Sequence, residues 1–449
     1  MHVLQQPGAA VQSTESDSAL IARLSCPGPR YSSYPDAAHF SADFGYRDYL
    51  QAVAGLRTRG SIKPLALYLH IPFCAAPCLA GCDKVVSINR DKAATYLCYL
   101  KREIEMQSRL FAGMNQVEQL HLGGGTPACM AKSQMDELMA HLRRCFQFAA
   151  DEQGEYAIDI DPYSATPASI AILRRQGFNH ISLNLQDGDD MPGAPQRCAH
   201  TTEALVVAAR AVAFRSVSIN LKVGSPEQDL GAMALTLAKV VAAAPDRIAV
   251  CNQSGCGGAQ TRLTMLELCI DTLGQAGYVY IGMDQFARQG DELAVAHVQG
   301  RLHRNFQGYS THADMDLVSC GVSAISAVAS TYSQNVKTLD AYYDLIDSNE
   351  LPIERGVRLS MDDALRRTII QMLMCQFELS IPSIEQAYPI DFAEYFAPEL
   401  AQLGQLARDG LVTLEAEWLS VTPRGRILIR TVCMVFDRYQ SAAPCAPGS

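Results

Sequence analysis

Between residues 62 and 252 the sequence repeats one unit, a short apolar strand followed by a helix. The expected strands are Leu65–Ile71, Gln119–Leu122, Tyr156–Ile160, His180–Leu185, Val217–Val223 and Arg247–Cys251. The expected helices are Tyr96–Phe111, Lys132–Phe146, Thr166–Gln176, Glu203–Ala213 and Met233–Ala243. Because strands that alternate with helices run parallel and are joined by right-handed crossovers, the pattern predicts the α/β fold class. Six units fit a partial (β/α)6 barrel, open on one side, whose functional groups lie at the carboxyl ends of the strands.

The segments around this barrel predict smaller parts. In chain order we expect a disordered tail (1–18), an N-terminal extension (19–61), the barrel (62–252), a site-covering extension (253–350), a helical, winged-helix-like C-terminal domain (351–441) and a short tail (442–449). The first tail is poor in large apolar side chains, which a packed core requires. Winged helices often bind DNA, but the last domain carries 9 Arg against 12 Asp and Glu. A structural or substrate-covering role is therefore favoured, since a DNA-binding face needs net positive charge.

The composition excludes several classes of protein. A net charge of −10 and a pI near 5.5 disfavour a nucleic-acid-binding surface. No apolar run approaches the roughly 18 residues of a membrane span, and His2–Thr14 lacks the apolar core of a signal peptide. The 15 cysteines show no disulfide framework, which is typical of a reduced compartment. We therefore expect a cytoplasmic protein that contacts neither membranes nor nucleic acid.

Three cysteines follow the first strand within nine residues. Cys74, Cys78 and Cys82 have the spacing C-x3-C-x3-C, directly after the alternating strand Leu65–Ile71. Thiolates this close together are what an iron–sulfur cluster or a zinc ion requires. The alternative is that they are ordinary loop cysteines.

A glycine run follows the second strand. Gly123, Gly124 and Gly125 precede Thr126 and Pro127. Glycines leave backbone N–H groups bare and let a ligand approach closely, although tight turns use them too.

Together, YLHIPFC at Tyr68–Cys74 and GGGTP at Gly123–Pro127 resemble the radical S-adenosylmethionine (SAM) enzymes, and in particular the oxygen-independent coproporphyrinogen III dehydrogenases. The resemblance covers roughly residues 29 to 440 and implies a [4Fe–4S] cluster and SAM as cofactors. It places Cys74 and Cys78 at the first two cluster-ligand positions. The family spacing is C-x3-C-x2-C, so Cys82 stands one position late as the third ligand. The N-terminal extension would lie over the substrate mouth.

The resemblance also implies a set of SAM contacts. These are Tyr68, Gly124, Gly125, Thr126, Asp159, Gln186, Asn220, Ser254 and Ile325. The chain departs from the family at three positions besides the cysteine loop. Asp159 replaces a Glu that binds the SAM ribose, Asn220 replaces an Asp, and Cys198 replaces an Arg that pairs with the SAM carboxylate.

The segment around LHRNFQGYSTHADMDL matches the family closely and implies the substrate side of the site. Its candidates for the porphyrinogen pocket are Arg304, Phe306, Gln307 and Tyr309. The plainer interpretation, ordinary core and turn residues, is disfavoured because a polar, glycine-containing stretch fills a core poorly.

Two hypotheses of different classes remain. In the first, the protein is an enzyme, a monomer served by an electron-donor protein, that converts coproporphyrinogen III to protoporphyrinogen IX for haem biosynthesis. In that reaction a 5′-deoxyadenosyl radical removes hydrogen from a propionate side chain, which loses CO2. In the second, the protein is a paralogue without a cluster that binds a tetrapyrrole or acts in regulation. The changes at four places that serve one cofactor favour the second hypothesis.

Overall fold

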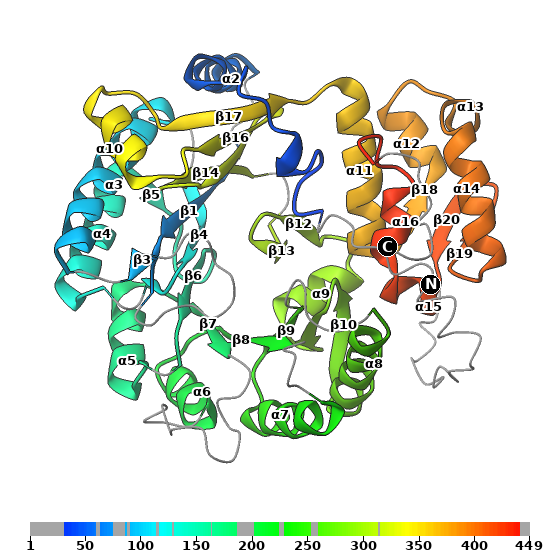
Figure 1. The fold of residues 1–449 in the computed structure, drawn as a ribbon, viewed down its shortest axis with the longest axis horizontal. Helices are drawn as coiled ribbons and strands as arrows, with labels where there is room; N and C mark the ends of the chain where they lie inside the picture. Colours follow the sequence, from blue (N-terminus) through cyan, green and yellow to red (C-terminus); the bar gives the residue numbers. More distant parts are fainter. Residues whose placement is uncertain are drawn as a thin grey trace.

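The computed structural model describes residues 31–59, 63–74, 86–87, 90–113, 116–127, 130–162, 164–185, 202–223, 229–252, 259–312 and 315–440. A large body built on one curved sheet occupies one side of the molecule, and a smaller helical body formed by residues 361–434 packs beside it (Figure 1).

The six predicted strand–helix units form the large body. The strands are β1 (Leu65–Ile71), β4 (Gln116–Gly124), β6 (Glu155–Ile160), β7 (His180–Leu185), β8 (Ser216–Val223) and β9 (Arg247–Asn252). The helices are α3 (Arg90–Leu110), α4 (Lys132–Cys145), α5 (Pro167–Gln176), α6 (Thr202–Ala211), α7 (Leu230–Ala243) and α8 (Ala259–Gln275). The strands pair in parallel in the order β9-β8-β7-β6-β4-β1, with the helices around the outside (Figure 1). The predicted partial barrel is confirmed.

Both ends of this sheet carry further strands. At the β9 end lie β11 (Gln285–Arg288) and β10 (Tyr278–Gly282), both antiparallel to their neighbours. At the β1 end, β14 (Asp316–Cys320) runs parallel to β1, followed by antiparallel β15 (Ile325–Val328), β16 (Thr331–Asn335) and β17 (Ile353–Arg358). The segment expected to cover the site therefore also extends the sheet, and the strand that starts at Ile353 belongs to the sheet of the large body.

Shorter elements complete the large body. They are α2 (Tyr46–Arg59), β2 (Phe73–Cys74), β3 (Val86–Ser87), β5 (Gln147–Phe148), α9 (Glu292–Val298), the hairpin β12 (His303–Asn305) and β13 (Gly308–Ser310), and α10 (Leu339–Asp347). The parallel pair β2–β3 brackets the cysteine loop, because Cys74 pairs with Ser87 across it.

Alternation along the strands separates an apolar face from a polar one. In β1 the side chains of Leu67, Leu69 and Ile71 are fully buried, whereas Tyr68 and His70 between them are partly exposed. The buried face packs under the surrounding helices in one continuous core. The opposite face lines the inside of the barrel and supplies the site.

The C-terminal body packs around a second core, which also includes side chains of β10, α9 and β13. Its elements are α11 (Met361–Gln376), β18 (Glu378–Ser380), α12 (Ile381–Ala387), α13 (Phe392–Tyr395), α14 (Ala397–Arg408), β19 (Val412–Leu414), β20 (Trp418–Val421), α15 (Pro423–Ile427) and α16 (Ile429–Met434). Its three strands pair in the order β18-β20-β19. Among the described residues, no helix combines the length and apolarity needed to cross a membrane.

The N-terminal segment connects the two bodies. After the short 3-10 helix η1 (Ala37–His39), Phe40 stacks on Tyr332 of β16. Before that helix, Tyr31 is buried in the C-terminal core and its hydroxyl donates to Asp437 Oδ2 at 3.0 Å. The extension therefore fixes the C-terminal body against the barrel.

Candidate functional site

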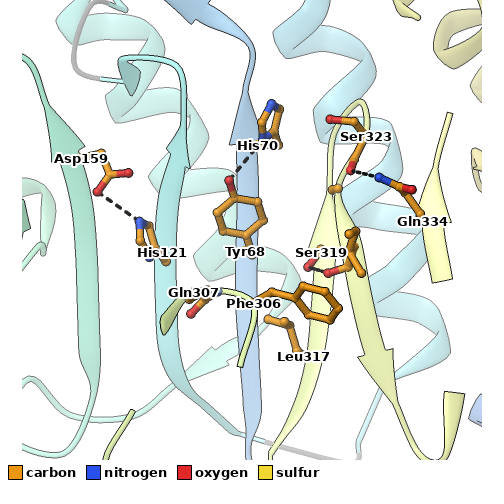
Figure 2. Close-up of a pocket in the computed structure, with 12 residues that line it drawn as sticks. Tyr68, His70, His121, Asp159, Phe306, Gln307, Leu317, Ser319, Ser323 and Gln334 are labelled. Atoms are coloured by element: carbon orange, nitrogen blue, oxygen red, sulfur yellow. Dashed lines mark hydrogen bonds and ion pairs between the residues drawn. The ribbon is translucent and has the colours of Figure 1, made fainter. Parts of the chain in front are cut away.

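A pocket of about 400 Å³ lies inside the barrel, beside the carboxyl-terminal halves of β1, β4 and β6. It is lined by Tyr68, His70, His121, Asp159, Phe306, Gln307, Leu317, Ser319, Ser323, Ala324, Ile325 and Gln334. These side chains converge from the strands, from the β12–β13 hairpin and from the β14–β15 turn (Figure 2). A mixed polar and apolar lining of this volume suits a small organic ligand.

Strand register brings three of the lining residues into one row. Tyr68 of β1 pairs with His121 of β4 on one side and with Ser319 of β14 on the other. Because residues paired across parallel strands point to the same face, their side chains share the inside of the barrel. The Tyr68 hydroxyl also lies 3.1 Å from His70 Nδ1, two residues along the same strand (Figure 2).

Asp159 of β6 lies opposite this row. Its Oδ1 is 3.3 Å from His121 Nε2, an ion pair when the imidazole is protonated (Figure 2). Burial alone would lower the pKa of His121, but the charge and hydrogen bond of Asp159 outweigh burial and raise the pKa. Burial, and secondarily the charge of Asp159, raises the pKa of Tyr68. The carboxylate that the sequence assigns to a SAM contact is thus held in the pocket by His121.

The glycine run is required by close packing. A Cβ on Gly125 would lie 2.2 Å from Phe73 O, and one on Gly124, where φ is +104°, would lie 2.6 Å from the His70 ring. Backbone bonds from Gly125 N to Ile71 O (2.7 Å) and from Thr126 N to Phe73 O (2.6 Å) tie the run to the start of the cysteine loop. A Cβ on Gly123 would enter the space between Tyr68, His121 and Asp159. Two glycines therefore seat β4 against the end of β1, and the third keeps the pocket open.

The β12–β13 hairpin supplies Phe306 and Gln307. Both amide atoms of Gln307, Oε1 and Nε2, are buried without a hydrogen-bond partner among the described residues. The same holds for Nε and Nη1 of Arg304, whose guanidinium lies 4.9 Å from the centre of the Tyr309 ring. Gln371 fixes the hairpin by bonding both the backbone N–H and the carbonyl of Arg304. A buried polar group left unpaired costs about 1–3 kcal/mol, so these groups are suited to a polar ligand.

The β14–β15 turn forms the opposite wall of the pocket. Ser319 Oγ donates to Ile325 O at 2.6 Å, and Gln334 Nε2 donates to Ser323 O at 3.2 Å (Figure 2). These bonds fix the position of Ile325, which the sequence assigns to a SAM contact.

The remaining predicted residues lie apart from this pocket lining or outside the described residues. Asn220 of β8 donates through Nδ2 to Asn184 Oδ1 on β7 at 2.8 Å. The side chains of Gln186, Ser254, Cys78 and Cys82 lie outside the described residues, as does Cys198, and for Cys74 only the backbone in β2 is described. The structure therefore brings together Tyr68, Asp159, Phe306, Gln307 and Ile325.

Sequence reasoning missed several lining residues. His70 and His121 were readable as polar positions in the strands LYLHI and QLHL, because they alternate with apolar residues. Ser319, Ser323 and Gln334 gave no signal, since they come from strands whose pairing with β1 is a long-range feature.

A second polar cluster lies at the amino ends of the strands. Glu155, His180 and Glu292 bring three possible metal-ligand atoms within 4.8 Å of one another. Burial lowers the pKa of His180 to about 4, so the ring is neutral. Arg247 Nη2 lies 3.9 Å from Glu292 Oε2, and Arg215 also pairs with Glu292. Because Arg247 and Arg215 both pair with Glu292, and Arg247 also pairs with Asp291, we interpret the cluster as a buried ion-pair network that closes the barrel.

Comparisons with known proteins agree on one family. The model of the HemN C-terminal domain matches residues 359–428. The "Oxygen-independent coproporphyrinogen III oxidase" of Pseudomonas aeruginosa is 42% identical over 94% of this chain and 96% of its own length. The protein of the same name from Escherichia coli K12 is 42% identical over 96% of this chain and 97% of its own length.

A solved structure gives the same result. The structure entitled "Coproporphyrinogen III oxidase (HemN) from Escherichia coli is a Radical SAM enzyme" superposes with a TM-score of 0.86 at 42% identity. The match covers 91% of this chain and 97% of that one. The similarity therefore extends over both bodies of the molecule.

Proposed function

This chain belongs to the oxygen-independent coproporphyrinogen III oxidase family, and from this premise we propose that it binds SAM and a [4Fe–4S] cluster and decarboxylates coproporphyrinogen III. When bound, the cluster and SAM would supply the one-electron chemistry that removes hydrogen from the propionate side chains. The protein itself contributes binding, orientation and exclusion of water.

The observation that carries this proposal is the pocket inside the barrel. It joins Tyr68 and Asp159 from the strands to Phe306, Gln307 and Ile325 from the opposite walls. The buried amide of Gln307, for which the described part of the chain offers no partner, can both donate to and accept from a ligand such as SAM. Asp159, which is polarised by His121, supplies an acceptor for hydroxyl groups.

For the tetrapyrrole we propose Arg304 as a carboxylate-binding residue. Coproporphyrinogen III carries propionate side chains, and Arg304 holds buried N–H groups that have no partner among the described residues. A charge-assisted hydrogen bond to a carboxylate contributes about 1.5–3 kcal/mol. The guanidinium lies over the Tyr309 ring, and Gln371 fixes the backbone of Arg304.

The donor set of the cysteine loop fits a cluster in number and kind. Cys74, Cys78 and Cys82 supply three thiols, and the β2–β3 pair anchors both ends of the loop that carries them. The GGGT segment bonds the same loop start at Ile71 and Phe73. We propose that Cys82 completes the set from its shifted position.

Anaerobic iron–sulfide reconstitution tests the proposal. We expect about four irons per chain and SAM cleavage on reduction. Cys82→Ala should lower the iron content, whereas Cys98→Ala, which removes an exposed thiol of α3, should leave it unchanged. Iron content equal to that of the wild type in Cys82→Ala would exclude Cys82 as a ligand, and a wild type without iron would refute the enzyme proposal.

A cluster-free tetrapyrrole-binding protein is the second candidate, favoured by the C-x3-C-x3-C spacing and by the neutral Asn220–Asn184 pair where the family pattern has an acid. Titration of the iron-free protein with coproporphyrin and with haem, followed by visible absorption, tests it. Arg304→Met should weaken coproporphyrin binding more than Arg304→Lys, which keeps the charge. No binding of either pigment would refute this candidate.

A further inference from the structure

Glu103 is a fully buried carboxylate on α3, with 0% of its surface exposed. Oε2 accepts hydrogen bonds from Gly321 N (2.7 Å) and from the Tyr342 hydroxyl (2.6 Å), and Oε1 accepts one from Asn335 Nδ2 (2.7 Å). All three partners are neutral donors. An ionised carboxylate, which only accepts, matches them completely, whereas a protonated one must itself donate.

These bonds end on the turn Gly321–Ala324 between β14 and β15. Besides its bond to Glu103, Asn335 Nδ2 donates to Gly321 O at 2.8 Å, and Asn335 N donates to Ala324 O at 2.9 Å. This turn carries Ser323 and Ala324 into the pocket wall and leads directly to Ile325.

The same helix also holds the other wall of the pocket. The Tyr96 hydroxyl, on the same face of α3 as Glu103, accepts from Val322 N at 3.1 Å and donates to His70 O at 2.7 Å. The turn and β1 are in close contact, because a Cβ on Gly321 would lie 2.6 Å from His70 O. Helix α3 therefore sets the distance between the β14–β15 turn and the strand that leads into the cysteine loop.

We propose that Glu103 is a positioning residue for the SAM pocket: its carboxylate holds the β14–β15 turn and thereby the wall at Ile325. This inference rests on the proposed binding of SAM. Glu103 itself does not line the pocket, so it acts through the turn. When the carboxyl is protonated, at least one of the three bonds is lost and the wall loosens.

The surroundings make this protonation accessible near neutral pH. Burial raises the pKa of Glu103 to about 7, although the bonds from Tyr342, Gly321 and Asn335 oppose the rise. The titratable groups that face it from α2, α3, β14 and α10 are Tyr49, Tyr96, Cys320 and Tyr342. Burial raises the pKa of each of these well above its usual value, so they stay neutral while Glu103 titrates.

Calorimetric titration of the iron-free protein with SAM tests the proposal between about pH 6 and about pH 8.5. In the wild type, loss of one hydrogen bond should weaken SAM binding about fivefold on the acid side of the Glu103 transition. Glu103→Gln places an NH2 group against hydrogen-bond donors. This variant should therefore bind SAM weakly at every pH, without the change in affinity that the wild type shows. Tyr342→Phe removes a donor that lowers the pKa of Glu103 and should move this change in affinity to higher pH.

The comparison between variants isolates Glu103 from other titrating groups. The groups that line the pocket and the amino group of SAM are common to all variants, so their contribution cancels. Glu105→Gln, on the same helix with a side chain 47% exposed, is the matched control and should retain the wild-type profile. The proposal would be overturned if the SAM affinity of Glu103→Gln varied with pH in parallel with that of the wild type. It would also be overturned if the affinity change in Tyr342→Phe occurred at the same pH as in the wild type.

Hydrogen exchange of the ligand-free protein separates this inference from the proposed function. The amides of residues 317–328 should exchange faster in Glu103→Gln, and faster in the wild type at low pH after correction for the intrinsic rate. If the wild type binds no SAM, the binding proposal fails, but the exchange data still test whether Glu103 positions the turn. Exchange that is the same in Glu103→Gln and the wild type would show that Glu103 does not position the turn.

Discussion

Replacing Glu103 by Gln should change how the stability of the fold depends on pH. In the unfolded chain this carboxyl has its ordinary pKa of 4.5, whereas burial raises the folded value to about 7. A raised folded pKa means that the native state binds the proton more tightly than the unfolded state does. The stability that the protonated group contributes is therefore fully present below about pH 4.5 and is lost as the pH rises through about 7.

The size of this effect follows from the pKa difference. One pKa unit corresponds to about 1.36 kcal/mol, so a rise of about 2.5 units amounts to about 3 kcal/mol over the whole range. Between about pH 6 and about pH 8 the loss is about 1 kcal/mol, because the part of the transition that lies below pH 6 is not included in this range. Gln does not titrate, and its variant lacks this slope.

Urea unfolding followed by far-ultraviolet circular dichroism measures the difference. The free energy of unfolding of Glu103→Gln minus that of the wild type should rise by about 1 kcal/mol from about pH 6 to about pH 8, with Glu105→Gln showing no such trend. If this difference in the free energy of unfolding did not change with pH, the proposed coupling between the ionisation of Glu103 and the stability of the fold would be refuted. Global stability and the order of the β14–β15 turn should thus move in opposite directions with pH, a signature that a purely structural residue would not give.

Three further changes test the packing and charges of the site. Gly125→Ala should lower the free energy of unfolding by more than about 2 kcal/mol, because its Cβ would lie 2.2 Å from Phe73 O. Gly55→Ala in α2, where an added Cβ meets nothing within 4 Å, should raise the free energy of unfolding by up to about 1 kcal/mol. Equal changes in the two variants would contradict the packing argument. Asp159→Asn should lower the pKa of His121 measured by NMR, since Asp159 supplies the charge that raises it, and an unchanged value would remove Asp159 as the cause. Asn220→Asp should strengthen SAM binding by at least about tenfold, as expected for a hydrogen bond to an ionised group. In this variant the Asn184 side chain should turn so that its amide NH2 donates to the new carboxylate. An unchanged affinity in calorimetry would place SAM elsewhere.

The strands and helices of the barrel were predictable because their signal is local. Alternation in LALYLHI predicts β1 to the residue, and the other five strands agree within three residues at either end. The position of β14 beside β1 was not predictable, since it pairs residues about 250 apart in the sequence and no local pattern encodes such pairing. The same limit applies to Tyr31 of the N-terminal segment, whose contact with Asp437 joins distant parts of the chain.

Glu103 shows a different limit. In the helix segment KREIEMQSR it resembles its neighbour Glu105, which is half-exposed and pairs with Arg109. Helical periodicity places Glu103 on the same face as the apolar Leu100 and Tyr96, but a carboxylate on that face is normally interpreted as a boundary position. Only the donors from Gly321, Tyr342 and Asn335 explain its burial, and all three come from distant segments.

The described residues that line the pocket come from β1, β4, β6, the β12–β13 hairpin and residues 317–334. The register of Tyr68, His121 and Ser319 is set by the pairing of β1 with β4 and with β14. We therefore expect SAM binding by the apoprotein to be separable from the cysteine spacing. It follows that Cys82→Ala, measured without iron, should bind SAM with the affinity of the wild-type apoprotein, whereas Gln307→Ala should weaken that binding. If Cys82→Ala weakened SAM binding in the absence of iron, the loop would contribute directly to the pocket and this separation would be wrong.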